Sequence, residues 1–171
     1  MKRLRLFVTG MFPRDYKDVG YWSEKEIMKL PVVNSLDYDE IILCGGEPTY
    51  FRGQTRNLAE SLRNVLDAMG KKDTKLYLQT HSCDYSDSDD IMRHCNGIIV
   101  MPLNADSMRY FRQLNKHFLD TQYRGKKYLQ LNIKPELAGF LPENMKLWRI
   151  VFQESSDSEI ETDLCRIDKP F

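Results

Sequence analysis

The chain has 171 residues, 42% of them hydrophobic and 29% charged, which is typical of one folded domain over residues 1–171. Lysine plus arginine and aspartate plus glutamate both number 25, so the formal net charge is zero and a nucleic-acid partner is not expected. No apolar run approaches the roughly 20 residues that cross a bilayer, which predicts a cytoplasmic protein with no membrane partner.

Short apolar runs alternate with helical patterns along the chain. The predicted strands are residues 4–9, 40–44, 75–79, 97–101, 128–133 and 147–152. The predicted helices are residues 23–30, 58–69, 87–94 and 108–119. Residues 135–144 are expected to form a loop or a single short turn. The acidic, serine-rich residues 154–163 are expected to form a solvated loop or tail.

This alternation predicts an α/β fold built from right-handed βαβ units around a mostly parallel sheet. Six strands of this kind form either an incomplete (β/α)6 barrel or an open doubly wound sheet. In both architectures ligands bind beyond the carboxyl ends of the strands, so polar residues at the strand ends are the candidate site.

The turn after the second predicted strand is the most specific motif in the chain. Gly45 and Gly46 follow the apolar run Ile41-Ile42-Leu43-Cys44, and glycines there permit a positive φ and a close ligand approach. Glu47 places a carboxylate at the strand end, and Pro48 stiffens the turn.

Leu43-Cys44-Gly45-Gly46-Glu47-Pro48-Thr49 resembles the Gly-Gly-Glu-Pro motif of the radical S-adenosylmethionine (SAM) superfamily, especially its short members, the activases of anaerobic ribonucleotide reductases and the deazaguanine synthases. The resemblance implies an incomplete barrel and backbone contacts between this turn and the amino group of SAM. Carried over by position, the implied ligand-binding residues are Gly45, Gly46, Glu47, Pro48, Thr80, Ser82 and Asn104.

The loop after the first strand departs from that family. Members carry Cys-x-x-x-Cys-x-x-Cys there, whose thiolates hold a [4Fe–4S] cluster, whereas residues 10–22 of this chain contain no cysteine. Cluster iron needs soft thiolate ligands, so no [4Fe–4S] cluster is expected. SAM stays a candidate ligand. In the loop at 11–22, Arg14 and Lys17 could meet an anion.

The cysteines at positions 44, 83, 95 and 165 have no zinc-ligand spacing and are expected to be reduced thiols. Asp84, Asp87, Asp89 and Asp90 form an acidic cluster that helix capping by Asp87 and solvation explain better than a cation, so no metal site is predicted. His81, at a strand end, is a candidate general base.

The leading hypothesis is therefore a radical-SAM-like protein without the cluster, a pseudoenzyme that binds a small nucleotide-like ligand at the strand ends. One alternative is an enzyme of different chemistry that uses Glu47, His81 or Asp84 for acid–base work. Another is an interaction module whose protein partner binds Tyr16, Tyr21, Trp22 and the acidic tail.

Overall fold

The structure is a computed structural model, and it describes residues 1–8, 37–121, 127–153 and 161–166. The predicted helix over 23–30 and the loop over 11–22 lie outside these residues. None of the described helices is long and apolar enough to span a bilayer.

The strands form one sheet in which every neighbouring pair is parallel. The strands are β1 (Lys2–Phe7), β2 (Glu40–Cys44), β3 (Lys75–Thr80), β4 (Gly97–Val100), β5 (Tyr128–Ile133), β6 (Trp148–Phe152) and β7 (Glu161–Arg166). Their spatial order is β6-β5-β4-β3-β2-β1-β7, so β6 and β7 are the two edges of an open sheet. The predicted α/β class and parallel sheet are confirmed.

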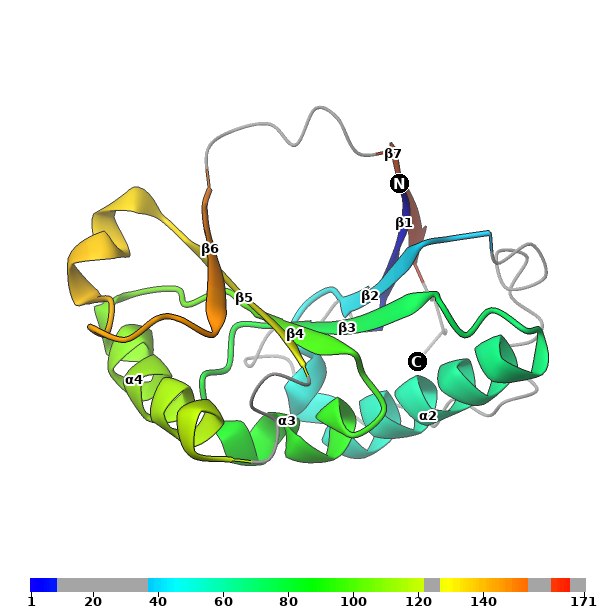
Figure 1. Cartoon of the computed structure of the whole chain (residues 1–171), viewed down its shortest axis with the longest axis horizontal. Coiled ribbons are helices and arrows are strands. Elements are labelled where there is room, and N and C mark those ends of the chain that lie inside the picture. The colour runs from blue at the N-terminus through cyan, green and yellow to red at the C-terminus, as the bar shows by residue number, and fades with distance from the viewer. Residues whose placement is uncertain (9–36, 122–126, 154–160, 167–171) are drawn as a thin grey trace.

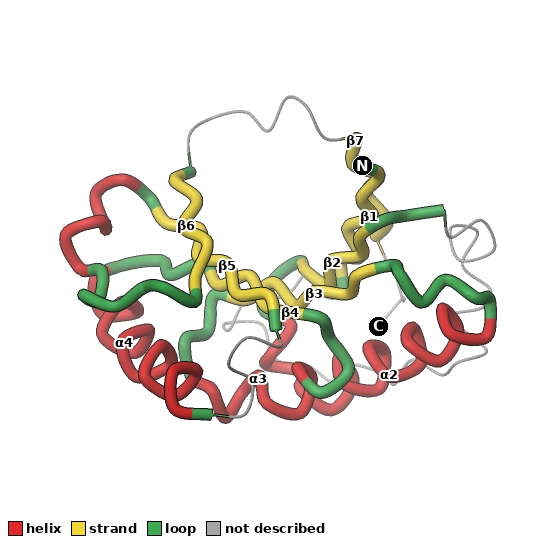
Figure 2. The backbone as a smooth tube through the Cα atoms, in the orientation of Figure 1, coloured by secondary structure: helices red, strands yellow, loops and turns green. Residues whose placement is uncertain are grey.

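The sheet is strongly curved, with β6 rising on one side and β1 and β7 on the other (Figure 1). Helices α2 (Arg52–Ala68), α3 (Tyr85–Met92) and α4 (Ala105–Asp120) all lie against the convex face (Figure 2). A doubly wound sheet carries helices on both faces, whereas the described helices of this chain cover one. The concave face is therefore left as a place where a ligand can meet the sheet.

The main core lies between the convex face and the helices. Helix α2 contributes a buried stripe that includes Leu58, Leu62 and Leu66, and α4 contributes Phe111 and Phe118. These stripes follow the spacing of three or four residues that was predicted for residues 58–69 and 108–119, because that spacing keeps apolar side chains on one helical face.

A buried polar contact joins α4 to the strand at the sheet edge. Trp148 of β6 packs edge-on against Phe111, with ring centroids 4.8 Å apart, and its indole nitrogen donates to Asn115 Oδ1 at 3.0 Å. The Asn115 amide nitrogen in turn donates to the Asn144 carbonyl at 3.0 Å. Both polar groups are satisfied, so this end of the core is held by directional bonds as well as packing.

Two helix ends illustrate how local sequence sets the boundaries. Gly70 has φ 71° after α2, and the amide of Lys71 donates to the Leu66 carbonyl at 2.8 Å, which confirms the predicted glycine stop. Helix α3 begins earlier than predicted, because Asp84 is its N-cap and accepts from the Ser86 amide at 2.9 Å. The predicted cap near Ser86 is therefore wrong by two residues.

Two further segments test the predictions for the second half of the chain. A 3-10 helix, η2, covers Pro135–Phe140, in agreement with the single short turn expected there. The loop or tail predicted for 154–163 is wrong for residues 161–163, which belong to β7, while 154–160 lie outside the described residues. Strand β7 gains its hydrogen bonds from β1, a partner far away in the sequence.

Gly97 should be intolerant of a side chain. A Cβ placed there would overlap the main-chain carbonyl of Tyr128 on the neighbouring strand. We expect Gly97→Ala to lower the free energy of unfolding by about 1–3 kcal/mol, as overpacked positions do. Urea denaturation measures the change. The matched control is Gly53→Ala in α2, where a Cβ meets open space, and it should not destabilise the fold.

Candidate functional site

The turn after β2 has the backbone geometry that its glycines predict. Gly45 has φ 84° and Gly46 has φ 50°, both in the left-handed region. Residues with a Cβ rarely adopt these values, so the two glycines are required by the turn itself. The 3-10 helix η1 (Pro48–Phe51) follows, and Pro48 occupies its first turn, where a missing N–H costs nothing.

The Glu47 carboxylate is buried and serves as a brace between two strand ends. Its Oε1 accepts from Thr49 Oγ1 at 2.7 Å, from the Thr49 amide at 3.1 Å and from Thr80 Oγ1 at 2.6 Å. Its Oε2 accepts from the His81 amide at 2.7 Å. A buried carboxylate is stable only with such donors, and here they join the end of β2 to the end of β3.

The other strand-end candidates gather around this brace. The Ser82 amide donates to Thr80 Oγ1 at 2.9 Å, and the Ser82 hydroxyl donates to Asp87 Oδ2 at 2.7 Å. His81 Nδ1 lies 2.9 Å from the Met101 carbonyl, which can only accept, so Nδ1 carries the proton. Gly45, Gly46, Glu47, Pro48, Thr80, His81 and Ser82 thus belong to one region at the carboxyl edge of the sheet.

Asp84 and Asn104 act as helix caps. Asp84 Oδ1 accepts from the Ser86 amide and from the Ser86 hydroxyl, at 2.9 and 2.8 Å. Asn104 Oδ1 accepts from the amide and the hydroxyl of Ser107, at 2.9 and 3.0 Å, and caps α4. Both residues are exposed, so their observed bonds stabilise helix starts.

Cys44, Cys83 and Cys95 are buried thiols. Burial raises the pKa of Cys44 to about 11 and the pKa of Cys95 to about 12. Burial, helped by the nearby Glu47 carboxylate, also raises the pKa of Cys83 to about 12. The thiolate is the nucleophile and the metal ligand, and these sites disfavour it. Among the described residues, no three His, Cys, Asp or Glu side chains gather as a metal site.

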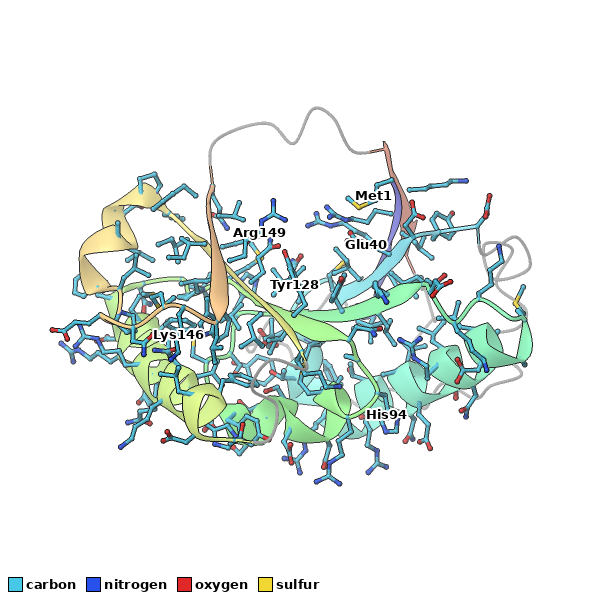
Figure 3. The ribbon with its side chains drawn as sticks, viewed as in Figure 1. Met1, Glu40, His94, Tyr128, Lys146 and Arg149 are labelled. Carbon is cyan, nitrogen blue, oxygen red and sulfur yellow. The ribbon has the colours of Figure 1, made fainter. Side chains whose placement is uncertain are left out.

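The concave face carries a polar cavity that the sequence reasoning missed. The cavity has a volume of about 230 Å³. Its charged and polar lining residues are Arg3, Arg5, Glu40, Tyr77, Gln79, Tyr128, Gln130, Asn132 and Arg149. Figure 3 shows Glu40, Tyr128 and Arg149 on this hollow side of the sheet, away from the helices. We call this region the trough.

The lining residues of the trough alternate with buried apolar residues along each strand. In β5 the burial alternates strictly, with Leu129, Leu131 and Ile133 buried against the helices and the intervening residues half-buried in the trough. In β1, Arg3 and Arg5 alternate with Leu4 and Leu6 in the same way. The pattern was visible in the sequence, but only the strand register brings the polar positions of several strands to one face.

Two tyrosines form an aromatic wall of the trough. The rings of Tyr77 and Tyr128 have centroids 5.3 Å apart and are tilted by 49°. Burial and the neighbouring Glu40 carboxylate raise the pKa of Tyr77 to about 12. Tyr77 therefore keeps its proton at neutral pH and presents a hydroxyl to the trough rather than a phenolate.

Comparison with protein-family models, curated proteins and solved structures finds no match for this chain. Tyr16, Tyr21 and Trp22, considered above as partner contacts, lie outside the described residues.

Removing the Glu47 brace should destabilise the fold. Glu47→Ala leaves the donors of Thr49, Thr80 and His81 without their acceptor, so we expect the free energy of unfolding to fall by about 3 kcal/mol. Glu47→Gln keeps the shape of the side chain but replaces one acceptor oxygen with a donor. Its free energy of unfolding should lie between the values for Glu47→Ala and for the natural protein. The control is exposed Glu60→Ala on α2, with a change below about 0.5 kcal/mol in urea denaturation. If Glu47→Ala is as stable as the natural protein, the Glu47 carboxylate does not brace the two strand ends.

Cys44, Cys83 and Cys95 should react slowly in the folded protein. With the pKa at about 11 for Cys44 and about 12 for Cys83 and Cys95, few of these groups are thiolates at pH 8. Alkylation followed by mass spectrometry should give rates at least about a hundredfold below those of the same residues in urea. The native rates should rise with pH up to about 11. A fast native rate at Cys83 would instead indicate an activated thiol.

Proposed function

We propose that this protein is a radical-SAM-like incomplete barrel that binds a small nucleotide-like ligand at the carboxyl ends of its strands and carries out no radical reaction. SAM is the first candidate ligand. The observation that carries the proposal is the Gly45-Gly46 turn, with both residues at positive φ, held next to the end of β3 by the Glu47 carboxylate.

The fold supports this proposal in two ways. The chain places β1 to β6 side by side in sequence order, and the described helices lie on the convex face, as in part of a barrel wall. The turn lies at the carboxyl edge of that wall, where α/β proteins bind ligands. Two glycines without a Cβ let a ligand approach the main chain closely there.

The side chains that could ligate iron argue against a [4Fe–4S] cluster at this edge of the sheet. Three thiolates would have to follow β1, and residues 9–36 contain no cysteine. Cys44 and Cys83 are buried thiols whose pKa is raised to about 11 and about 12, which disfavours the charged form that binds iron. The chain's own residues therefore fit a ligand that is bound through the turn and not through iron.

Binding is favoured over acid–base chemistry because the two candidate carboxylates already have structural partners. Both oxygens of Glu47 accept hydrogen bonds and Asp84 caps α3, which leaves Nε2 of His81 as the single candidate base, since its Nδ1 donates to a carbonyl. A general base needs a lone pair within reach of a substrate proton. The enzyme hypothesis based on Glu47, His81 and Asp84 is accordingly the weaker of the two.

The proposal is tested by adding SAM, its demethylated product and common nucleotides to the protein in a thermal-shift assay. A ligand at one hundred times its dissociation constant stabilises the native state by about 2.7 kcal/mol, which corresponds to a rise in Tm of about 5–10 °C for a chain of this size. We expect one compound of this class to produce such a rise.

The location is checked by nuclear magnetic resonance, without any substitution. Binding at the turn should shift the backbone amide signals of Gly45 and Gly46, while Gly53 and Gly139 serve as internal controls on other elements. Stabilisation without movement of the Gly45 and Gly46 signals would contradict the proposed site. The absence of stabilisation by every compound would contradict the proposed ligand class.

A further inference from the structure

We propose that the trough is a second binding site, specific for the phosphate group of a small phosphorylated ligand held between Arg5 of β1 and Arg149 of β6. This site is independent of the ligand proposed for the Gly45-Gly46 turn. Four observations support it: the charge of the trough, the direction of its hydrogen bonds, its size and its face of the sheet.

The trough carries more positive than negative side chains. Three arginines and one glutamate line it, which gives a formal charge of +2. Arg3 binds Glu40 through two nitrogens, Nε at 2.9 Å and Nη2 at 2.8 Å, so this pair is neutral. The excess charge therefore belongs to Arg5 and Arg149, and a group that carries nearly two negative charges, such as a phosphate, balances it.

Arg5 has a donor that lacks an acceptor. Its Nη2 donates to Gln79 Oε1 at 3.1 Å, whereas its buried Nε has no hydrogen-bond partner among the described residues. Buried donors in folded proteins are almost always paired, and an unpaired guanidinium N–H is costly. Because Nε is buried, a phosphate oxygen becomes its acceptor only when the Arg5 side chain shifts on binding.

Arg149 sets the direction of a hydrogen-bond chain along β5. A guanidinium can only donate, so Arg149 Nη1 donates to the Tyr128 hydroxyl at 3.4 Å, and this hydroxyl donates to Gln130 Oε1 at 2.6 Å. The Gln130 amide nitrogen then donates to Asn132 Oδ1 at 2.7 Å. Each amide oxygen is used within the chain, which turns the Asn132 amide nitrogen into a donor for a ligand.

Gln79 is oriented in the same way. Its Oε1 accepts from Arg5, so its amide nitrogen is a donor. The trough therefore presents donors from Arg5, Gln79, Asn132 and Arg149, while its one carboxylate is engaged by Arg3. A wall of donors with two unbalanced positive charges fits an acceptor-only anion and disfavours a cation.

The size and the walls of the trough limit the ligand. A volume of about 230 Å³ is smaller than the roughly 300–1,000 Å³ of sites for drug-sized molecules, so the ligand is compact. The Tyr77 and Tyr128 rings offer a surface for a flat or apolar portion beside the phosphate. A small phosphate monoester fits these limits better than a complete dinucleotide.

The trough lies on the opposite face of the sheet from the Glu47 brace. Gln79 and Thr80 are neighbours in β3, and successive strand residues point to opposite faces. Gln79 lines the trough, whereas Thr80 binds Glu47 on the helix side. The phosphate site can therefore be occupied whether or not a ligand is bound at the turn.

The test uses phenyl phosphate and inorganic phosphate as probes at constant ionic strength, with isothermal titration calorimetry and the Arg5 Nε–H resonance as readouts. We expect saturable one-to-one binding and a shift of that resonance. Arg149→Gln should weaken phenyl phosphate binding by about tenfold, as expected for loss of a charge-assisted contact. Arg149 is exposed, so the variant should keep the Tm of the natural protein.

The matched control is Arg109→Gln, which removes the same charge from the exposed surface of α4 and should change the affinity by less than about twofold. Three results would overturn the proposal: no saturable binding of either phosphate, an equal loss of affinity in Arg109→Gln, or benzoate binding at least as tight as that of phenyl phosphate. Because the Arg5 signal reports the trough and the Gly45 signal reports the turn, each site is tested separately.

Discussion

The arrangement of this protein depends on one constraint, which is that a sheet shows two faces and the described helices cover only one of them. Successive side chains of each strand point to opposite faces, so the convex face can be apolar throughout. Leu129, Leu131 and Ile133 of β5 pack there, while Gln130 and Asn132 face the concave side. The polar trough is the consequence, because side chains on a face that the described helices leave uncovered can form hydrogen bonds with one another, with water or with a ligand.

The second organising element is a buried carboxylate that needs donors. Glu47 obtains them from its own turn and from the end of β3, so the same side chain shapes the Gly45-Gly46 turn and ties it to the next strand. Using the carboxylate in this way leaves the main chain of the turn as the part that can meet a ligand. Because the Glu47 carboxylate is engaged while the main chain of the turn is accessible, ligand binding is a better hypothesis than acid–base chemistry by Glu47 at this edge.

The two candidate regions place different demands on a ligand. At the carboxyl edge, glycine permits close contact with the backbone, which suits the polar atoms of a nucleotide-like molecule. In the trough, Arg5 and Arg149 supply charge, and oriented amides supply donors, which suits a phosphate. Both regions come from the same parallel strands, and the alternation of side chains separates them.

Local sequence determined much of the fold. The period of the apolar residues located α2 and α4, the apolar runs located the six predicted strands, and Gly45-Gly46 marked a turn that needs positive φ. Tertiary structure decided the rest. Strand β7 exists because β1 offers it an edge, and Glu47 bonds Thr80, which lies 33 positions further along the chain. The arginines and amides of the trough converge only through strand register, which depends on pairing between distant segments and leaves no trace in local periodicity.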